Sequence, residues 1–533
     1  MNSRRILVAL FLLGFALRAL LVALPLEESI SRILTDDAYY NLQVARHVLA
    51  GEGATFDGRH PTNGFHPLWM VACFLPLQLE DPVQVTRGLL ALASLVDLLG
   101  AAVLFAVLRR VAAPTFALVV TGAWLLNPVT IGLALNGLDT PLVFLLTTMA
   151  VGALISEASM ERPRRRRTDS LFALAFLARV DVLILCAMLG AFRVLEWLRK
   201  RHTLGSVFAT AGILAVTIVP YFAWNRIVYG LWTPASGLAL SEHLVHASGL
   251  HPGEGAGAAA WLAYFGEALS KFLPEYLAFY GANLLQGPVT GASSLVVLAG
   301  LFSLAVVFAF ASWTALRNRI DSRGWLPSIE IFVVLVPVAY FGAYLLRLGP
   351  KTRYILPALI AAWFVAGMAS RTWSKRDLLR RLGLALLPIL ALNLTWGWVQ
   401  LFATPDLHGW TRRANLTKGL EVLSEIPEDA RIGAFNSGVY AFFSGRDVVN
   451  LDGLINNDAY FAIRDHRLVD FIVEDDIDYV LDFADQIQLY LSAFGGLPLE
   501  RFGERFEIAR EIPLEDPLLA AANQRLLLLR VRR

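Results

Sequence analysis

Two adjacent carboxylates, Asp36 and Asp37, follow directly on a long apolar segment near the start of the chain. A carboxylate at a membrane boundary is costly to desolvate unless a partner or a task compensates for it. A carboxylate in that position can remove the proton from an attacking hydroxyl group. We therefore take this pair as the first candidates for catalysis. The alternative for Asp37 is capping of the helix that follows.

Cationic side chains that could hold a phosphate group occur near residue 350. Arg353 and Tyr354 precede an apolar run, and Arg347 and Lys351 lie just before them. The planar fork of an arginine suits phosphate oxygens. We predict a phosphate site here. Arg347 and Lys351 could instead extend toward lipid headgroups.

Five further polar residues could contribute to the same site. Asp139 follows an apolar segment, while Arg179 and Asp181 stand at a turn between two short apolar stretches. Asn63 and His66 lie in the polar loop after the two aspartates and could hold sugar hydroxyl groups. An internal ion pair is the alternative for Arg179 and Asp181. His66 could instead pack in the core or bind a metal ion.

The sequence requires no cofactor. A divalent metal ion is an open alternative where Asp36, Asp37 and Asp139 meet, since hard cations take oxygen ligands. Cys73 and Cys186 both lie in apolar runs, so neither a disulfide framework nor a cysteine metal site is expected. A glycine-rich nucleotide-binding motif is absent.

These residues must be positioned by a polytopic α-helical membrane protein. Of the 533 residues, 56% are hydrophobic and 17% are charged, which is too apolar for an ordinary soluble protein. We predict about eleven transmembrane helices in a catalytic domain at residues 1–400, with an external loop at residues 25–87. Basic clusters at alternate ends of the apolar segments place the N-terminus in the cytoplasm.

The expected segments include spans at 6–24, 88–108, 114–126, 140–155 and 204–224. Residues 171–197 should form two short helices with an external apex at residues 179–181. One re-entrant hairpin is the alternative. Residues 127–139 should form an external connection. After the two aspartates, residues 39–48 read as a short amphipathic helix on the membrane surface. A second surface segment follows at residues 66–79, because its length falls short of the roughly 20 residues needed to cross.

Residues 401–533 read as a soluble α/β domain outside the membrane. They hold 22 acidic and 14 basic side chains, a net charge of −8, which leaves +10 for residues 1–400. Short apolar runs at 431–435, 447–451, 479–483 and 526–531 predict strands, with helical stretches such as 417–425 between them. The loops 436–438 and 450–453 follow strands and could carry binding groups or be plain turns.

On this topology the candidate residues all fall at the external ends of spans, which suggests one shared site. The expected cytoplasmic loops are too short to build a nucleotide-sugar pocket. A donor substrate should therefore arrive within the membrane. We expect membrane lipids as surroundings and no nucleic-acid partner.

The first external loop contains an ordered set of motifs: Asp36-Asp37-Ala38-Tyr39, Arg46, Gly51, Gly53, Phe56-Asp57-Gly58 and His66-Pro67-Leu68-Trp69. With this set the loop resembles that of the GT-C superfamily of membrane glycosyltransferases, in particular its bacterial arabinofuranosyltransferase-like and protein O-mannosyltransferase-like members. Arg353-Tyr354 resembles an Arg-Tyr element of the same superfamily. The loop is specific for the superfamily and says little about the sugar.

The resemblance implies an inverting transferase that takes a sugar from a polyprenyl phosphate and passes it to an external glycan, lipid or protein. It implies Asp36 as the general base, with Asp37 second. Donor phosphate would be held by Arg353, Tyr354, Lys351 and Arg347, and substrate by Asn63, His66, Asp139, Arg179 and Asp181. The expected location is a bacterial inner membrane. The alternatives are a transporter or lipid flippase, and a scaffold whose tail binds partners.

Overall fold

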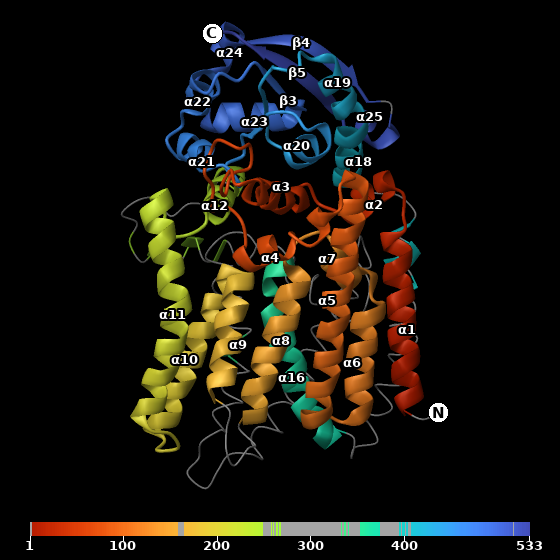
Figure 1. The fold of residues 1–533 in the computed structure, drawn as a ribbon, viewed down its shortest axis with the longest axis vertical. Helices are drawn as coiled ribbons and strands as arrows, with labels where there is room; N and C mark the ends of the chain where they lie inside the picture. Colours follow the sequence, from red (N-terminus) through yellow and green to blue (C-terminus); the bar gives the residue numbers. More distant parts are fainter. Residues whose placement is uncertain are drawn as a thin grey trace.

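The structure is a computed structural model that describes residues 3–157, 165–248, 352–373, 407–514 and 516–533, with short stretches between 257 and 340 and between 394 and 402. Helices of residues 1–373 stand side by side, and a mixed α/β unit lies across one end of them (Figure 1). The N-terminus lies at the opposite end. Arg347 and Lys351 fall outside the described residues.

Four of the described helices are long and apolar enough to cross a membrane: α1 (Ser3–Val22), α5 (Pro82–Val111), α8 (Thr140–Glu157) and α11 (Leu204–Tyr229). A bent pair, α6 (Pro114–Leu126) and α7 (Pro128–Leu135), could form a fifth span. The helices expected at 6–24, 88–108, 114–126, 140–155 and 204–224 are thus confirmed. The total of about eleven remains a prediction.

Residues 127–139 are not the simple connection that we expected. Most of them form α7, which bends by 58° from α6. The bend has a local cause, because Pro128 cannot donate the backbone hydrogen bond that would continue α6. Asn127 then begins the new helix, since its side chain accepts a hydrogen bond from the Val129 N–H at 2.8 Å.

Two short helices, α9 (Arg165–Ala178) and α10 (Leu183–Leu198), meet at a 3₁₀ turn, Val180–Val182. This confirms the predicted pair of helices and its apex. After α11 come α12 (Ala235–Ser248), η3 (Thr352–Ile355) and α16 (Leu356–Trp373).

The loop between α1 and α5 lies between the membrane-type helices and the tail (Figure 1). It contains α2 (Leu26–Arg32), α3 (Asp37–Ala50), α4 (Pro67–Ala72) and η1 (Pro76–Gln78). We expected α3 to lie on a membrane surface with one polar face. Instead its residues from Ala38 to Ala45 are all buried, because α20 of the tail packs over it.

The tail contains a five-stranded sheet in the order β2-β1-β3-β5-β4. Neighbours β2, β1 and β3 are parallel, whereas β5 is antiparallel to both β3 and β4. The strands are β1 (Ile432–Ala434), β2 (Val448–Asn450), β3 (Tyr479–Phe483), β4 (Phe506–Pro513) and β5 (Arg525–Val531). Four of them confirm the predicted strands. Strand β4 was missed because it is an exposed edge strand rich in charged residues.

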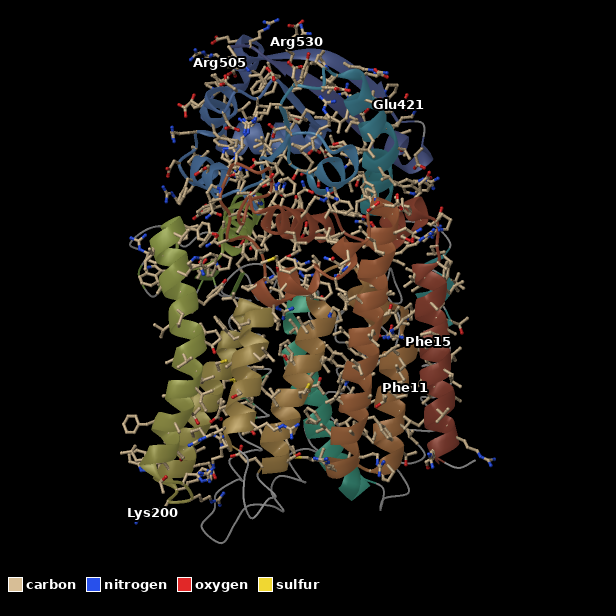
Figure 2. All side chains as sticks on the ribbon, viewed as in Figure 1. Phe11, Phe15, Lys200, Glu421, Arg505 and Arg530 are labelled. Atoms are coloured by element: carbon tan, nitrogen blue, oxygen red, sulfur yellow. The ribbon has the colours of Figure 1, made fainter. Side chains whose placement is uncertain are left out.

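Helices and turns complete the tail around this sheet. They are α18 (Leu407–Ala414), η4 (Asn415–Gly419), α19 (Leu420–Glu425), α20 (Gly438–Ser444), α21 (Asn457–Arg464), α22 (Leu468–Glu474), α23 (Ala484–Phe494), η5 (Leu499–Arg501), α24 (Phe502–Arg505) and α25 (Pro517–Ala521). Exposed charged side chains, including Glu421, Arg505 and Arg530, cover the outer face of the tail, while Phe11 and Phe15 lie on α1 (Figure 2). The tail therefore has a polar surface and α1 an apolar one.

Candidate functional site

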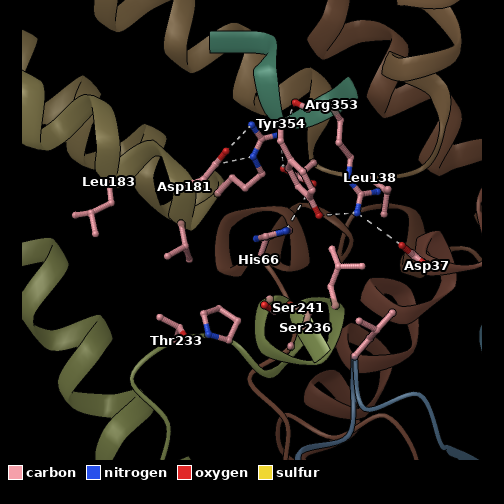
Figure 3. A pocket seen from close by; sticks show the side chains of 18 of the residues that line it. Asp37, His66, Leu138, Asp181, Leu183, Thr233, Ser236, Ser241, Arg353 and Tyr354 are labelled. Atoms are coloured by element: carbon pink, nitrogen blue, oxygen red, sulfur yellow. Dashed lines mark hydrogen bonds and ion pairs between the residues drawn. The ribbon is translucent and has the colours of Figure 1, made fainter. Parts of the chain in front are cut away.

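A cavity of about 530 Å³ lies where α3, α10, α12, η3 and the tail meet. Its polar wall carries most of the residues that the sequence singled out: Asp37, His66, Asp139, Arg179, Asp181, Arg353 and Tyr354. Its apolar wall is formed mainly by α10, α11 and α12, through Leu183, Ile184, Ala187, Phe222 and Leu240. Figure 3 shows the polar side chains converging from separate elements. The cavity is therefore amphipathic.

Arg353 approaches Asp37, the second residue of the aspartate pair. Its Nη2 lies 3.7 Å from the Asp37 Oδ2 and donates a hydrogen bond to the Tyr354 hydroxyl at 3.1 Å. Its Nε atom is buried and has no hydrogen-bond partner among the described residues. Arg353 thus keeps donor capacity for a ligand.

Arg179 has a structural role beside this cation. Its guanidinium makes two hydrogen bonds to the Asp181 carboxylate, at 2.7 and 3.0 Å, which is the ion pair given above as the alternative. It also donates to the Arg353 backbone carbonyl at 3.0 Å. Because Arg179 joins η2 to η3, it fixes where Arg353 enters the cavity.

His66 and Asp139 also belong to the polar wall. The His66 Nε2 and the Arg179 Nη1 are each 3.8 Å from an Asp139 oxygen, and Asp139 is almost fully buried. Burial, with the charges of Arg179 and Arg353, lowers the pKa of His66 below its ordinary value, against the opposing effect of Asp139. His66 is therefore neutral near pH 7. Its Nδ1 has no hydrogen-bond partner in the part of the chain that the structure describes.

Asp36 does not line the cavity. Its Oδ2 and Oδ1 accept hydrogen bonds from the backbone N–H groups of Gly438 and Val439, at 2.8 and 2.9 Å, in the first turn of α20. Burial raises the pKa of Asp36 to about 7 despite these hydrogen bonds. Sequence reasoning ranked Asp36 above Asp37, but the structure turns Asp36 toward the tail and Asp37 toward the cavity. The partner of Asp36 lies 402 residues away and leaves no sequence signal.

Asn63 also lies outside the cavity wall, contrary to its expected role as a sugar ligand. Its Oδ1 accepts a hydrogen bond from the Ala235 N–H at 2.9 Å, and its Nδ2 donates to the Asn225 Oδ1 at 2.7 Å. The side chain is buried and fully occupied by α11 and the start of α12. Asn63 therefore positions α12 and has no free atom for substrate.

The tail contributes to the cavity, which sequence reasoning missed. Leu454 lines it, and the nearby Asp452 accepts a hydrogen bond from the Tyr40 hydroxyl at 3.0 Å. The glycine at 64 lets the two parts touch, because a Cβ atom there would lie 1.9 Å from the Leu454 carbonyl oxygen. The sequence did offer one indication of this contribution, because the loops 436–438 and 450–453 follow predicted strands, where binding groups are common. In the structure both loops contact the N-terminal part of α3 or its cap.

The three aspartates of the alternative metal site, Asp36, Asp37 and Asp139, do not form a cluster in the described part of the chain. Asp36 faces α20, whereas Asp37 and Asp139 face the cavity. Among the residues that the structure describes, no three His, Cys, Asp or Glu side chains are close enough to hold a metal ion.

The fold resembles those of known membrane transferases. The *apo* oligosaccharyltransferase of Archaeoglobus fulgidus matches with a TM-score of 0.55 and 13% identity, over 93% of this chain and 71% of that chain. ArnT from Cupriavidus metallidurans, in a structure bound to undecaprenyl phosphate, matches with a TM-score of 0.55 and 15% identity, over 97% of each chain. AglB of A. fulgidus, in complex with an inhibitory peptide and a dolichol-phosphate, matches with a TM-score of 0.51 and 11% identity, over 91% of this chain and 71% of that chain.

Sequence comparison adds a match in the tail. The family described as "Domain of unknown function (DUF8728)" matches residues 408–523. No curated protein matches the chain. The chain thus shares the fold of these solved structures, in agreement with the fold that the resemblance of its first loop implied.

Proposed function

We propose that this protein is an integral membrane glycosyltransferase that moves a sugar from a polyprenyl phosphate to an acceptor hydroxyl group. The observation that carries the proposal is the position of Arg353. This arginine stands at the polar end of an amphipathic cavity, 3.7 Å from Asp37, with a buried and unpaired Nε.

The cavity suits a ligand with a lipid chain and an anionic headgroup. The phosphate would bind the Arg353 guanidinium, because charge-assisted hydrogen bonds from arginine to phosphate are strong and directional. The isoprenoid chain would follow the wall of Leu183, Ile184 and Phe222, where apolar surface replaces water. The ArnT structure named above holds undecaprenyl phosphate, which supports this class of ligand.

Asp37 is the general base of the proposed reaction. Its carboxylate takes the proton of the acceptor hydroxyl while that oxygen attacks the anomeric carbon of the donor. The bond from the anomeric carbon to the phosphate oxygen breaks, and the polyprenyl phosphate leaves with the electron pair. Arg353 and the Tyr354 hydroxyl stabilise the charge on the leaving phosphate. Attack opposite the leaving group inverts the anomeric centre.

The remaining polar groups position the substrates. Neutral His66 can bind a sugar hydroxyl through its unpaired Nδ1, and Asp139 can accept a hydrogen bond from the same sugar. Asp36 and Asn63 support the site from outside by holding α20 and α12. Arg347 and Lys351 remain proposed phosphate ligands, although they lie outside the described residues.

Transfer is favoured over transport. The solved structures named above are an oligosaccharyltransferase and ArnT, and the cavity has one polar end with a base and a cation together. We further propose an inner-membrane location in a bacterium, with a cytoplasmic N-terminus and an external tail. The acceptor can be a glycan, a lipid or a protein in this proposal.

The experiment is transfer by the purified full-length protein in detergent or nanodiscs. The donor is drawn from a panel of synthetic polyprenyl-phosphate sugars with a labelled sugar, and membranes supply the acceptors. We expect label to leave at least one donor, with release of polyprenyl phosphate, and Asp37→Asn to stop it. The same donors are also tested with the protein reconstituted into vesicles, where movement of intact donor across the bilayer without cleavage would instead identify a flippase.

A further inference from the structure

Three neutral polar side chains line one part of the cavity wall: Asn41 of α3 and Ser236 and Ser241 of α12. The Asn41 Oδ1 is buried and has no hydrogen-bond partner among the described residues. Ser236 and Ser241 lie across the cavity from Arg353 and Tyr354 (Figure 3). They therefore form a region distinct from the proposed phosphate site.

Asn41 gives the strongest sign of a ligand. The residue is 6% exposed, lines the cavity, and has a buried Oδ1 without a hydrogen-bond partner. Leaving such an atom unpaired costs roughly 1–3 kcal/mol, so native proteins pair nearly all of them with protein, water or ligand. Asn41 is one helical turn beyond Asp37, so both side chains share one face of α3. A hydroxyl compound bound by Asn41 would lie within reach of the Asp37 carboxylate.

The part of the wall that α12 forms has no charged lining residue among those described, and it is already held in place. The backbone N–H at the start of α12 is bound by the Asn63 Oδ1, and Ala235 and Ala239 pack on Tyr460 of the tail. The charged residues that line the cavity lie on α3, on η3 or at residues 139–181, and none lies on α12 or the tail. Among the described residues that line this side, no cation is available to a phosphate or carboxylate.

Apolar surface lies beside these hydroxyl and amide groups. Leu240 of α12, Leu454 of the tail and Tyr40 of α3 line the same cavity. Neutral hydrogen-bonding groups next to apolar and aromatic surface match a sugar ring, which has hydroxyl groups on its rim and C–H groups on its faces. Residue 64 and the Leu454 carbonyl meet backbone to backbone at this side of the cavity, since a Cβ atom on residue 64 would lie 1.9 Å from that carbonyl oxygen.

We propose that Asn41, Ser236 and Ser241 form the acceptor subsite, and that the acceptor is a neutral, hydroxyl-bearing saccharide. This inference rests on the proposed function, because it assigns the acceptor half of the same cavity. The Asn41 amide holds one acceptor hydroxyl and directs its neighbour to Asp37. The tail, through Leu454, completes the subsite and so helps to select the acceptor.

Binding can be measured without knowing the natural substrates. The probes are methyl glycosides of neutral hexoses and pentoses, with methyl glucuronide and a blocked Ser-Thr dipeptide for comparison. Saturation-transfer NMR with the full-length protein reports their binding, and a separate titration with undecaprenyl phosphate reports the donor half. The variants are Asn41→Leu, which nearly conserves volume, and the double variant Ser236→Ala/Ser241→Ala. Ser492→Ala, an exposed serine of α23, is the matched control.

We expect neutral glycosides to bind the wild type and the control, and to bind Asn41→Leu about tenfold more weakly, as the loss of a hydrogen bond predicts. Undecaprenyl phosphate should bind all of them equally, which also shows that the variants are folded. Equal glycoside binding by Asn41→Leu and wild type would overturn the inference. Binding of the dipeptide or the glucuronide with no neutral glycoside bound would overturn it too.

The two proposals fail differently in this design. Subsite-dependent glycoside binding without undecaprenyl phosphate binding would support the saccharide subsite and contradict the lipid donor. Undecaprenyl phosphate binding without any glycoside binding would support the donor and contradict the subsite.

Discussion

Asp36 and Asp37 are neighbours in the chain, yet their carboxylates meet different groups. Both oxygens of Asp36 accept hydrogen bonds from the first turn of α20, while Asp37 faces the cavity and Arg353. A carboxylate that is bound by two backbone N–H groups is poorly placed to take a proton from a substrate. The structure therefore supports Asp37 as the base and Asp36 as the residue that fastens the tail.

Replacement of each aspartate separates the two roles. Asp37→Asn should lower the transfer rate by roughly 100- to 10,000-fold, as loss of a general base does, and leave the melting temperature unchanged. Asp36→Asn should destabilise the protein by about 1–2 kcal/mol, because only one amide oxygen remains to cap α20, and retain measurable transfer. Initial transfer rates and thermal unfolding, measured on the same preparations of each variant, test both predictions. Full activity in Asp37→Asn would contradict this assignment.

Arg353 should dominate the binding of the lipid phosphate. Arg353→Gln removes the charge but keeps much of the side chain, so we expect undecaprenyl phosphate to bind roughly 10- to 100-fold more weakly, as loss of a charged hydrogen bond predicts. Arg464→Gln, on the tail surface and paired with Asp465, is the control. A titration with undecaprenyl phosphate, monitored by intrinsic fluorescence, gives the dissociation constant of each variant. Equal affinity in the two variants would remove Arg353 from the donor site.

Side chains at the ends of apolar segments could be recognised from the sequence. Asp37, Asp139 and Arg353 follow or precede predicted spans. The ends of spans on the same side lie at the same membrane surface, so these side chains could be expected near one another. The partners of Asp36 and Asn63 could not be recognised, because they depend on how the tail and α12 pack. Asn41 was not predicted as a site residue, because a neutral amide within a helix does not stand out in the sequence as a charged residue does.

At the scale of elements, the loop between α1 and α5 joins the two halves of the molecule. His60 is held between the carboxylates of Asp57, at 2.6 Å, and Asp475 of the tail, at 3.1 Å. These hydrogen bonds and charges raise the pKa of His60 to about 10 against the effect of burial. The loop is thus fastened to the tail by a charged histidine.

This pKa shift predicts how the joint responds to pH. The folded pKa lies above the unfolded value of about 6.5, so the stabilisation is complete below that pH and is lost as the pH rises through about 10. Hydrogen exchange of residues 56–64 should therefore accelerate between pH 7 and pH 10, after correction for intrinsic exchange. His60→Gln should exchange faster at pH 7 and show a flatter profile. A flat profile in the wild type would show that the ion pair does not fasten the loop.

The close contact of residue 64 with the tail gives a second test of the joint. Gly64→Ala places a methyl group against the Leu454 carbonyl, so the loop and the tail must separate. We expect faster proteolysis of the segment between β2 and α21 and a large loss of transfer. Gly212→Ala is the control, because a Cβ atom there meets nothing within 4 Å. Unchanged proteolysis in Gly64→Ala would contradict the contact.

The elements were predicted with uneven success for physical reasons. Long apolar helices and short buried strands leave a composition signal, so their positions were found closely. Helix α3 was predicted as a surface helix because its covering partner, α20, is distant in sequence. Strand β4 is exposed and charged, and the bend between α6 and α7 depends on a single proline.

At the scale of the whole molecule, the tail and the N-terminus lie at opposite ends, and Lys200 lies at the end away from the tail (Figures 1 and 2). Basic residues in the turn between α10 and α11 predict a cytoplasmic position for that end. The site, which lies under the tail, would then face outward.

Cysteine labelling in intact cells tests this orientation. Cys73 and Cys186 are both buried, so they should give little background. Ser492→Cys in the tail should react with a membrane-impermeant maleimide, whereas Thr203→Cys in the turn before α11 should react only after permeabilisation. The opposite pattern would place the site in the cytoplasm.

The central claim is that one cavity holds a lipid phosphate at Arg353 beside the Asp37 carboxylate. A structure of the full-length protein with undecaprenyl phosphate tests it most directly. The account predicts phosphate oxygens within hydrogen-bond distance of the Arg353 guanidinium and the isoprenoid chain along Leu183 and Phe222. A phosphate bound elsewhere, with the cavity under the tail empty, would contradict it.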